Sequence, residues 1–412
     1  ASAQAGKGLA SISKWVSLGS DIGCVWGEAK GSAALPYQTC IDLSEPAFKC
    51  SCPSRKFPCK HGLGLFLLYA QGHCQTGSRP AWVTEWLDKR ATRTETKVAK
   101  PRAEADPEAQ SKRAAKREDH VASGIADCET WLRDLVRDGF ANPAQASRRH
   151  FEAIASRLVD SQAPGLARLV RQMGETVSSG PAWQERLLER AATLYLLLQA
   201  FKRQDLLSDP VRADMRQAIG WTIRREELAA EPQVADVWTV LGQRTIVEDR
   251  VTTQRSWLYG VGTKRWATVL AFSVAGSPYD PALVPGTALA GSLAFFPGAA
   301  PLRALPMEVE ATAPIPQPVA TIDECLYAYA TALSESPWIE AFPFALGNVR
   351  FGRTGDRWLA VQEGKALPLS SRLEPWKVLA LTGGEPFDLV GEWNGRELEG
   401  LSAQIGGRLC RL

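Results

Sequence analysis

The sequence has few histidines and no long apolar run. Its 412 residues include four histidines: His61, His73, His120 and His150. The longest apolar runs, at 63–70 (with one glycine) and 194–198, are far shorter than the about 20 residues that a membrane-spanning helix needs. The N-terminus lacks the charged and then apolar pattern of a signal peptide. We therefore expect an intracellular, cytoplasmic protein with no membrane span.

Sequence patterns of common enzyme classes are also missing. The segment Gly260-Val261-Gly262-Thr263-Lys264 is too short for a Walker A phosphate loop and leads into an expected strand rather than a helix. The chain has no Gly-x-Ser-x-Gly elbow and no His-Glu-x-x-His motif. We expect that the protein is not an enzyme. An active site of distant carboxylates, gathered by folding in the C-terminal β-rich region, is the weaker alternative.

The cysteine count and the charge distribution are both uneven. Nine cysteines is an odd number, which excludes a complete disulfide framework, and three of them lie within ten residues. In a reducing compartment this clustering favours a metal site. The net charge is only +3, but residues 1–118 hold 18 Lys/Arg against 11 Asp/Glu. A polyanionic partner would therefore bind the N-terminal quarter of the chain.

The clustered cysteines form a metal-binding pattern with one histidine. The pattern consists of four residues, Cys50, Cys52, Cys59 and His61. In a strand, residues i and i+2 face the same side, so the first two sulfurs would point to one place. Pro53 then ends the strand, and the last two ligands arrive at the start of the following helix. Three thiolates and one imidazole close a tetrahedral shell, which predicts one structural Zn²⁺ rather than a catalytic ion.

Other cysteines and histidines compete poorly for the same ion. His73 lies twelve residues beyond His61, which is about 18 Å along a continuous helix. Cys74 follows it and is equally remote in the sequence. Cys24 and Cys40 lie on preceding strands, where we expect them to act as small core residues.

The spacing Cys-x-Cys-x₆-Cys-x-His, followed by an apolar helix, resembles the SWIM-type zinc finger. The segment 48–61 is similar to the form found in bacterial SWIM proteins, and the resemblance covers about residues 36–72. It implies the same four ligands, with no departure from the family pattern. It also implies DNA binding or protein–protein contact rather than catalysis. The bacterial members are companions of AAA+ ATPases and von Willebrand-type proteins, so such an assembly is one expected partner.

The rest of the chain divides by composition into further regions. Residues 1–88 predict a ββα-like zinc finger unit, with strands at 24–28, 37–43 and 47–52 and a helix at 60–71. Residues 89–118 hold ten Lys/Arg, five Asp/Glu and almost nothing large and apolar, which predicts a basic linker. Residues 119–230 show apolar side chains at helical spacing and predict a helical domain.

Residues 231–412 predict a β-rich α+β domain. Asn394-Gly395 between two alternating segments favours a hairpin with a type I′ turn. Thr321, with Glu324 three residues later, predicts the capping box of one interrupting helix. The fold class is therefore α+β multidomain, with an N-terminal zinc finger unit, a central helical region and a C-terminal β-rich region.

Three cations crowd the expected zinc loop and leave two interpretations open. Arg55, Lys56 and Lys60 could balance the net negative charge of a zinc–thiolate cluster, or they could contact phosphate. The leading hypothesis is a zinc-binding, non-enzymatic interaction or scaffold protein that uses the finger to bind protein partners or nucleic acid. The alternative is a sequence-nonspecific DNA-binding protein with these three cations as contacts. The oligomeric state does not follow from the sequence.

Overall fold

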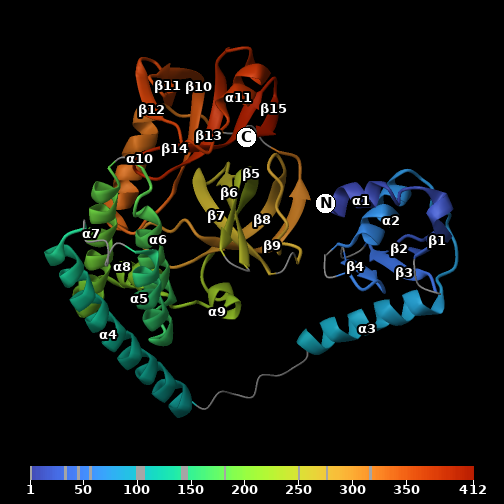
Figure 1. Ribbon diagram of the computed structural model, residues 1–412, viewed down its shortest axis with the longest axis horizontal. Coiled ribbons are helices and arrows are strands. Elements are labelled where there is room, and N and C mark those ends of the chain that lie inside the picture. The colour runs from blue at the N-terminus through green and yellow to red at the C-terminus, as the bar shows by residue number, and fades with distance from the viewer. Residues whose placement is uncertain are drawn as a thin grey trace. The chain divides into compact units, whose positions relative to one another are not determined.

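The computed structural model divides the chain into two compact units, and the boundary between them lies just before Pro107. The structure describes residues 2–31, 35–43, 47–54, 58–98, 107–140, 147–180, 182–248, 251–274, 277–314 and 318–412. Figure 1 labels the helices and strands of both units. The observed order is a small mixed unit, then helices, then strands, so the predicted α+β fold class is confirmed.

The N-terminal unit, called the finger unit below, is a sheet between helices. Among its described residues the sheet has four antiparallel strands in sequence order: β1 (Trp15–Ser20), β2 (Cys24–Ala29), β3 (Tyr37–Asp42) and β4 (Ala47–Cys50). The helices are α1 (Ser2–Lys7), α2 (Lys60–Ala70) and α3 (Ala81–Val98). The strand β1 and the helix α3 were not predicted from the sequence.

The two faces of this sheet carry separate apolar cores. On one face Val25, Ile41 and Leu65 belong to a buried cluster that joins the sheet to α2. On the other face Cys24 and Cys40 are buried with Val83 of α3. Alternate residues of a strand point to opposite faces, so β2 and β3 can supply both cores. The prediction that these two cysteines are small core residues is confirmed.

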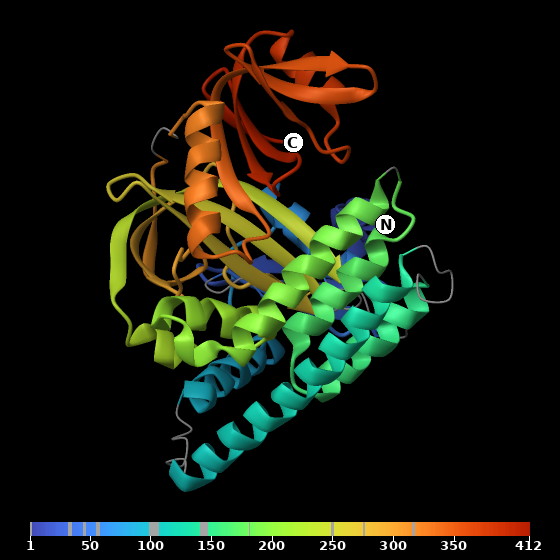
Figure 2. The ribbon, with the colours of Figure 1, turned by 90° about the vertical axis from the view of Figure 1, so that its left-hand side faces the viewer.

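The predicted basic linker, residues 89–118, contains two helical stretches. Its first residues belong to α3, and its last residues belong to α4 (Pro107–Asp138). Lys112, Arg113 and Lys116 on the first turns of α4 are exposed. Figures 1 and 2 both show this end of α4 extending beyond the helices that follow it. Charged residues with good helix propensity favour such a helix even where nothing packs against it.

A helical bundle opens the second unit. Its helices are α4, α5 (Arg148–Asp160), α6 (Pro164–Thr176), α7 (Trp183–Lys202) and α8 (Asp209–Ile219). Their apolar sides meet in one core, which includes the fully buried Phe151, Leu166, Met173 and Leu194. A short helix, α9 (Arg225–Ala229), leads from the bundle into the strands.

One buried carboxylate, Glu129, ties α4 to α7. It accepts hydrogen bonds from Lys202 at 2.5 Å, Arg133 at 2.7 Å and Gln199 at 2.9 Å. The bond from Lys202 is the main cause that holds the pKa of Glu129 below its ordinary value of 4.5. Because the pKa is lowered in the folded state, the resulting stability is present above pH 4.5 and is lost as the pH falls through the folded-state pKa.

We expect Glu129→Gln to lower the free energy of unfolding by about 1.5–3 kcal/mol at pH 7, the range for hydrogen bonds to charged groups. Denaturant titrations at several pH values would measure this difference between the variant and the unchanged protein. It should shrink as the pH falls below 4.5. Glu152→Gln is the control, because Glu152 makes an exposed ion pair with Arg171 at 2.9 Å and such pairs contribute little. An equal loss of unfolding free energy in both variants would contradict the conclusion that the buried hydrogen bonds of Glu129 stabilise the bundle.

The first β-rich part is a curled antiparallel sheet. In the described residues it has five strands in the order β7-β6-β5-β8-β9. Their bounds are β5 (Gln233–Glu248), β6 (Val251–Gly260), β7 (Arg265–Val274), β8 (Ala288–Phe295) and β9 (Ala304–Thr312). The edge strand β7 approaches the other edge, because the Thr268 N–H donates to the Leu302 carbonyl at 2.7 Å. The apolar side chains inside the curl, Trp238 and Leu258 among them, form its core.

The second β-rich part is a sheet with two helices. Its strands follow the order β12-β11-β10-β13-β14-β15 among the described residues. They are β10 (Phe342–Thr354), β11 (Arg357–Gln362), β12 (Lys365–Pro368), β13 (Phe387–Trp393), β14 (Leu398–Ile405) and β15 (Arg408–Arg411). The helices are α10 (Ile322–Glu335) and α11 (Pro375–Thr382). The predicted capping box of Thr321 and Glu324 is present at the start of α10.

The predicted hairpin around Asn394 forms, but with a different turn. Trp393 pairs with Leu398, so the loop has four residues rather than two. The side-chain oxygen of Asn394 accepts hydrogen bonds from the N–H groups of Arg396 at 2.9 Å and Glu397 at 3.0 Å. Gly395 has a positive φ of 90°, whereas a type I′ turn needs positive φ at both central residues. The asparagine side chain therefore stabilises a wider turn.

A buried charge cluster joins the two sheets. Glu392 on β13, with 2% of its surface exposed, accepts a hydrogen bond from the Trp257 indole at 2.7 Å. Arg244 and Arg255 lie 3.1 and 3.3 Å from the same carboxylate. Arg244 also contacts Glu399 of β14 at 3.0 Å. These strands are far apart in the sequence, so the cluster fixes how the two sheets pack.

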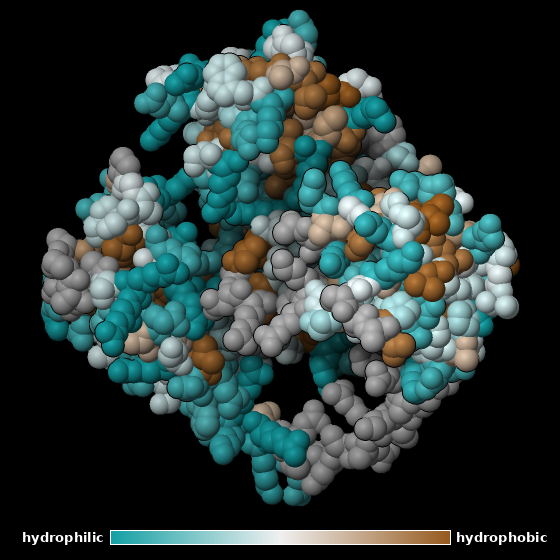
Figure 3. Space-filling view, turned by 45° about the vertical axis from the view of Figure 1, so that its right-hand side comes forward, coloured by the Kyte–Doolittle hydropathy of each residue, from teal (hydrophilic) through white to brown (hydrophobic). Residues whose placement is uncertain are grey.

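The surface is mainly polar. Figure 3 shows one face, on which hydrophilic side chains predominate and hydrophobic ones gather in separate patches. Isolated exposed apolar residues are normal on folded proteins. Within the described part of the chain, every helix is too short or too polar to cross a bilayer.

Candidate metal centre

The four predicted ligands converge in the structure. The ligand atoms of Cys50, Cys52, Cys59 and His61 all lie within 4.8 Å of one another. The Cys50 sulfur lies 3.7 Å from Nδ1 of His61. Cys59 and His61 are buried, whereas Cys50 and Cys52 are half-buried. The structure therefore brings together every residue that the spacing selected as a ligand.

Strand pairing and a helix start hold the ligands in place. Cys50 ends β4 and pairs with Thr39 on β3. Ser51 continues the pairing, because its N–H donates to the Gln38 carbonyl at 2.9 Å, and Cys52 follows directly. Cys59 is the N-cap of α2, which places His61 in the first turn of that helix. The metal centre thus connects the edge of the sheet to the helix that covers it.

Hydrogen bonds at this site favour the ionised, thiolate form of the cysteine side chains. The Thr39 hydroxyl lies 3.1 Å from the Cys50 sulfur and can donate to it once the thiol is ionised. A hydrogen bond from Cys50 lowers the pKa of the Cys59 thiol to about 4, and the backbone N–H groups of Gly62 and His61 act in the same direction. The same bond raises the pKa of Cys50 well above its ordinary range. One thiolate is therefore already favoured before a cation binds.

Close packing fixes the helix against the sheet behind the ligands. The Tyr37 ring lies 5.0 Å from the His61 ring, centroid to centroid. A Cβ added at Gly62 would lie 2.9 Å from the ring of Phe48, which is closer than carbon atoms pack. Phe48 of β4 therefore packs directly against the backbone of α2. Glycine is needed here because of this close approach.

The donor set and its spacing fit one structural zinc ion. Ligands at about 2.3 Å (sulfur) and 2.0 Å (nitrogen) from zinc, at tetrahedral angles, lie roughly 3.5–3.8 Å from each other. The sulfur–nitrogen distance of 3.7 Å agrees with this range. Three cysteines and one histidine would hold the ion, and zinc bound there supplies a cross-link rather than an open coordination position. Soft sulfur donors are unsuited to Mg²⁺ or Ca²⁺.

The structure describes only one of the three predicted cations near the metal centre. Lys60 is exposed, next to the ligand His61, whereas Arg55 and Lys56 lie outside the described residues. His73 and Cys74 are not members of the metal cluster found among the described residues. Thr39 and Tyr37 contact the ligands but were not selected from the sequence. They lie more than ten residues before the motif, and only the pairing of β3 with β4 brings them to it.

Comparison with known proteins gives two matches along the chain. Residues 49–70 match the SWIM zinc finger. Residues 116–219 match the SWIM-associated four-helix bundle domain, and this range covers most of α4 and all of α5 to α8. Neither a curated protein nor a solved structure matches the chain. The two matches occur in the same order as the finger unit and the bundle.

Proposed function

Because the chain is a SWIM-type zinc finger protein, we propose that it is a non-enzymatic cytoplasmic adaptor that binds a protein partner through its finger unit. The observation that carries this proposal is the closed donor set of Cys50, Cys52, Cys59 and His61. A catalytic zinc keeps one position for water or substrate, and four protein ligands fill all of them. The zinc ion would then stabilise the fold of the finger unit, and the surface of that unit would bind the partner.

Exposed apolar side chains on the finger unit favour a protein partner. Six of them are large and solvent-accessible: Ile12, Val16, Ile22, Leu35, Phe66 and Tyr69. Phe66 and Tyr69 are three residues apart on α2 and thus lie on one side of that helix. Where exposed apolar side chains adjoin, as Phe66 and Tyr69 do on α2, the surface favours a protein contact over a phosphate contact. An assembly of the AAA+ ATPase and von Willebrand type is the partner that the SWIM resemblance implies.

Nucleic acid is the second candidate partner. Lys60 beside the metal ligands and Lys112, Arg113 and Lys116 at the start of α4 are exposed cations. Several cations on one unit, such as the three at the start of α4, would bind phosphates together, and the binding would weaken steeply with salt. Phosphate binding would depend on these cations rather than on the exposed apolar side chains of the finger unit.

Affinity capture from the native cell, with and without nuclease, tests the proposal. The bait is the full chain, compared with Ile22→Ser and Phe66→Ser variants that leave all four ligands in place. We expect captured proteins that survive nuclease and are lost with the serine variants, because each variant removes apolar contact area. Zinc content should stay at one equivalent in both variants, which shows that the finger still binds its ion.

Two outcomes would contradict the proposal. Complexes that disappear on nuclease treatment would assign the interaction to nucleic acid. Captured proteins that are equally abundant with the serine variants would place the contact outside these apolar residues.

A further inference from the structure

All nine cysteines of the chain are free, and a small solute can reach only some of them. Cys50, Cys52, Cys74 and Cys410 are half-buried, whereas the other five are buried. The first two belong to the metal cluster, in which all four ligand atoms lie within 4.8 Å of one another. Reachable sulfur atoms therefore lie beside other sulfur atoms at the metal centre. From this arrangement we propose that the metal centre is also a site of reversible oxidation, at which hydrogen peroxide links Cys52 to Cys59 and releases the bound zinc.

Cys52 is the cysteine that reacts with the peroxide. It is half-buried and lies two residues beyond Cys50, the last residue of β4. The Cys50 sulfur is held more firmly, because it lies 3.1 Å from the Thr39 hydroxyl and accepts a hydrogen bond from the backbone N–H of Cys52. Hydrogen bonds that stabilise a thiolate also make it a weaker nucleophile. Of the two accessible ligands, Cys52 should therefore react first.

Cys59 is the cysteine that completes the disulfide. It is buried at the N-cap of α2, so a solute reaches it less easily than Cys52. Its sulfur nevertheless makes hydrogen bonds with the side chains of both Cys50 and Cys52, which places it next to the reacting sulfur. Strand pairing with Thr39 holds Cys50 in β4, whereas Cys52 lies beyond the end of that strand and can move toward Cys59. The expected product is the Cys52–Cys59 disulfide.

The reaction balances with a single molecule of hydrogen peroxide. Zinc-bound cysteines are thiolates, and the thiolate is the nucleophilic form. The Cys52 sulfur attacks one peroxide oxygen, the O–O bond breaks, and hydroxide leaves, which gives a sulfenic acid. The Cys59 thiolate then attacks the sulfur of that sulfenic acid, so that the S–S bond forms, the S–O bond breaks and a second hydroxide leaves. The two sulfurs together lose two electrons, the peroxide gains them, and two protons from water turn the hydroxides into water.

Oxidation would change which parts of the finger unit are joined. Four ligands hold a structural zinc ion, and after the reaction only Cys50 and His61 remain. The ion would then leave, and the cross-link between Cys50 of β4 and His61 in the first turn of α2 would be lost. The disulfide joins only the two ends of the segment between Cys52 and Cys59. The finger unit would therefore be weakened by peroxide and restored by a reductant with zinc, whichever partner it binds.

Titration of the zinc-loaded full-length protein with hydrogen peroxide tests the inference. A chromogenic chelator measures the released zinc, and mass spectrometry of a digest prepared without reductant locates the disulfide. We expect each equivalent of peroxide to release one equivalent of zinc and to form one Cys52–Cys59 link, because the reaction consumes one peroxide for each disulfide. Dithiothreitol followed by zinc should restore the original metal content.

The double variant Cys74→Ser with Cys410→Ser is the matched control. It removes the two half-buried cysteines outside the metal cluster and leaves all four ligands in place. Its release of zinc should follow the same stoichiometry as that of the unchanged protein. Dimedone, which traps sulfenic acids, should label Cys52 of the unchanged protein and lower the yield of the disulfide.

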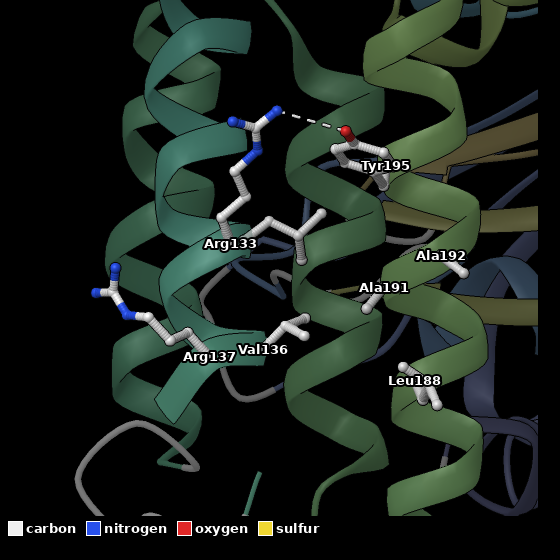
Figure 4. Close-up of a pocket in the computed structure, with 8 residues that line it drawn as sticks. Arg133, Val136, Arg137, Leu188, Ala191, Ala192 and Tyr195 are labelled. Atoms are coloured by element: carbon white, nitrogen blue, oxygen red, sulfur yellow. Dashed lines mark hydrogen bonds between the residues drawn. The ribbon is translucent and has the colours of Figure 1, made fainter. Parts of the chain in front are cut away.

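Hydrogen exchange along the chain shows that the effect is confined to the finger unit. Amides of β4 and α2 should exchange at least about tenfold faster after oxidation, because local opening becomes easier once the cross-link is lost. The bundle is the internal reference, since Cys128 on α4 is buried. Figure 4 shows α4 and α7 side by side, joined by the hydrogen bond from Arg133 to the Tyr195 hydroxyl. Exchange in these two helices should stay unchanged.

Three results would overturn the inference. One is full retention of zinc after an equivalent of peroxide has been consumed. Another is a disulfide that links Cys50 to either of the other two cysteine ligands in place of the Cys52–Cys59 link. The third is oxidation to sulfinic acid at the metal centre, because dithiothreitol and zinc would then fail to restore the metal content.

Discussion

Replacing Cys59 by serine is expected to abolish zinc binding and to unfold the finger unit, while the second unit keeps its own unfolding transition. Structural zinc contributes an apparent binding free energy of about 10–16 kcal/mol at pH 7, which matches or exceeds the about 5–15 kcal/mol that stabilises a typical domain. The ion cross-links β4 to α2, so its loss leaves only apolar packing to hold the two layers together. Zinc content by elemental analysis and hydrogen exchange along the chain would measure both effects.

Cys52→Ser should behave in the same way, because it removes another of the four ligands. Cys74→Ser is the control, since Cys74 is a half-buried cysteine that packs against the finger core outside the metal cluster. It should retain one equivalent of zinc. A full equivalent in Cys59→Ser would refute the assignment of that ligand.

The second large effect is expected in the charge cluster between the two sheets. Glu392→Gln should lower the free energy of unfolding of the second unit by about 3–5 kcal/mol, because Arg255 would lose its buried counter-charge and Arg244 would keep only Glu399. The Trp257 indole would still find an oxygen acceptor in glutamine, so the loss reports on charge. Chemical denaturation with an unchanged m-value would measure it.

Glu385→Gln provides the comparison for this experiment. Glu385 pairs with Arg350 at 3.6 Å, but its side chain is 78% exposed, and such pairs contribute less than about 1 kcal/mol. Equal losses of unfolding free energy in the two variants would show that the burial of Glu392 does not account for its contribution to stability.

The metal ligands were predictable because their geometry is local. All four lie within twelve residues, and strand and helix periodicities fix how such close neighbours face each other. The groups that complete the site were not predictable from spacing. Thr39 and Tyr37 reach the ligands through the pairing of β3 with β4, and that register is not encoded in the motif.

The missed elements have weak local signals. The strand β1 begins with an irregularity between Trp15 and Ser17, which breaks the alternation that identifies a strand. The helix α3 starts near Trp82 and Trp86, but its later residues are highly charged and resemble a linker. Glu392 lies 135 and 137 residues from Trp257 and Arg255, so only the folded chain reveals their contact.

The position of β4 has a consequence for a cell that runs short of zinc. Among the described residues β4 is the last strand of its sheet and only four residues long, and it carries the ligand Cys50. Without the ion, this short strand would keep mainly the packing of Phe48 to hold it against α2. If the strand detached, β3 would present unpaired N–H and C=O groups. Such an edge is a template for association with other chains. Metal supply would then determine whether the finger unit stays monodisperse or aggregates.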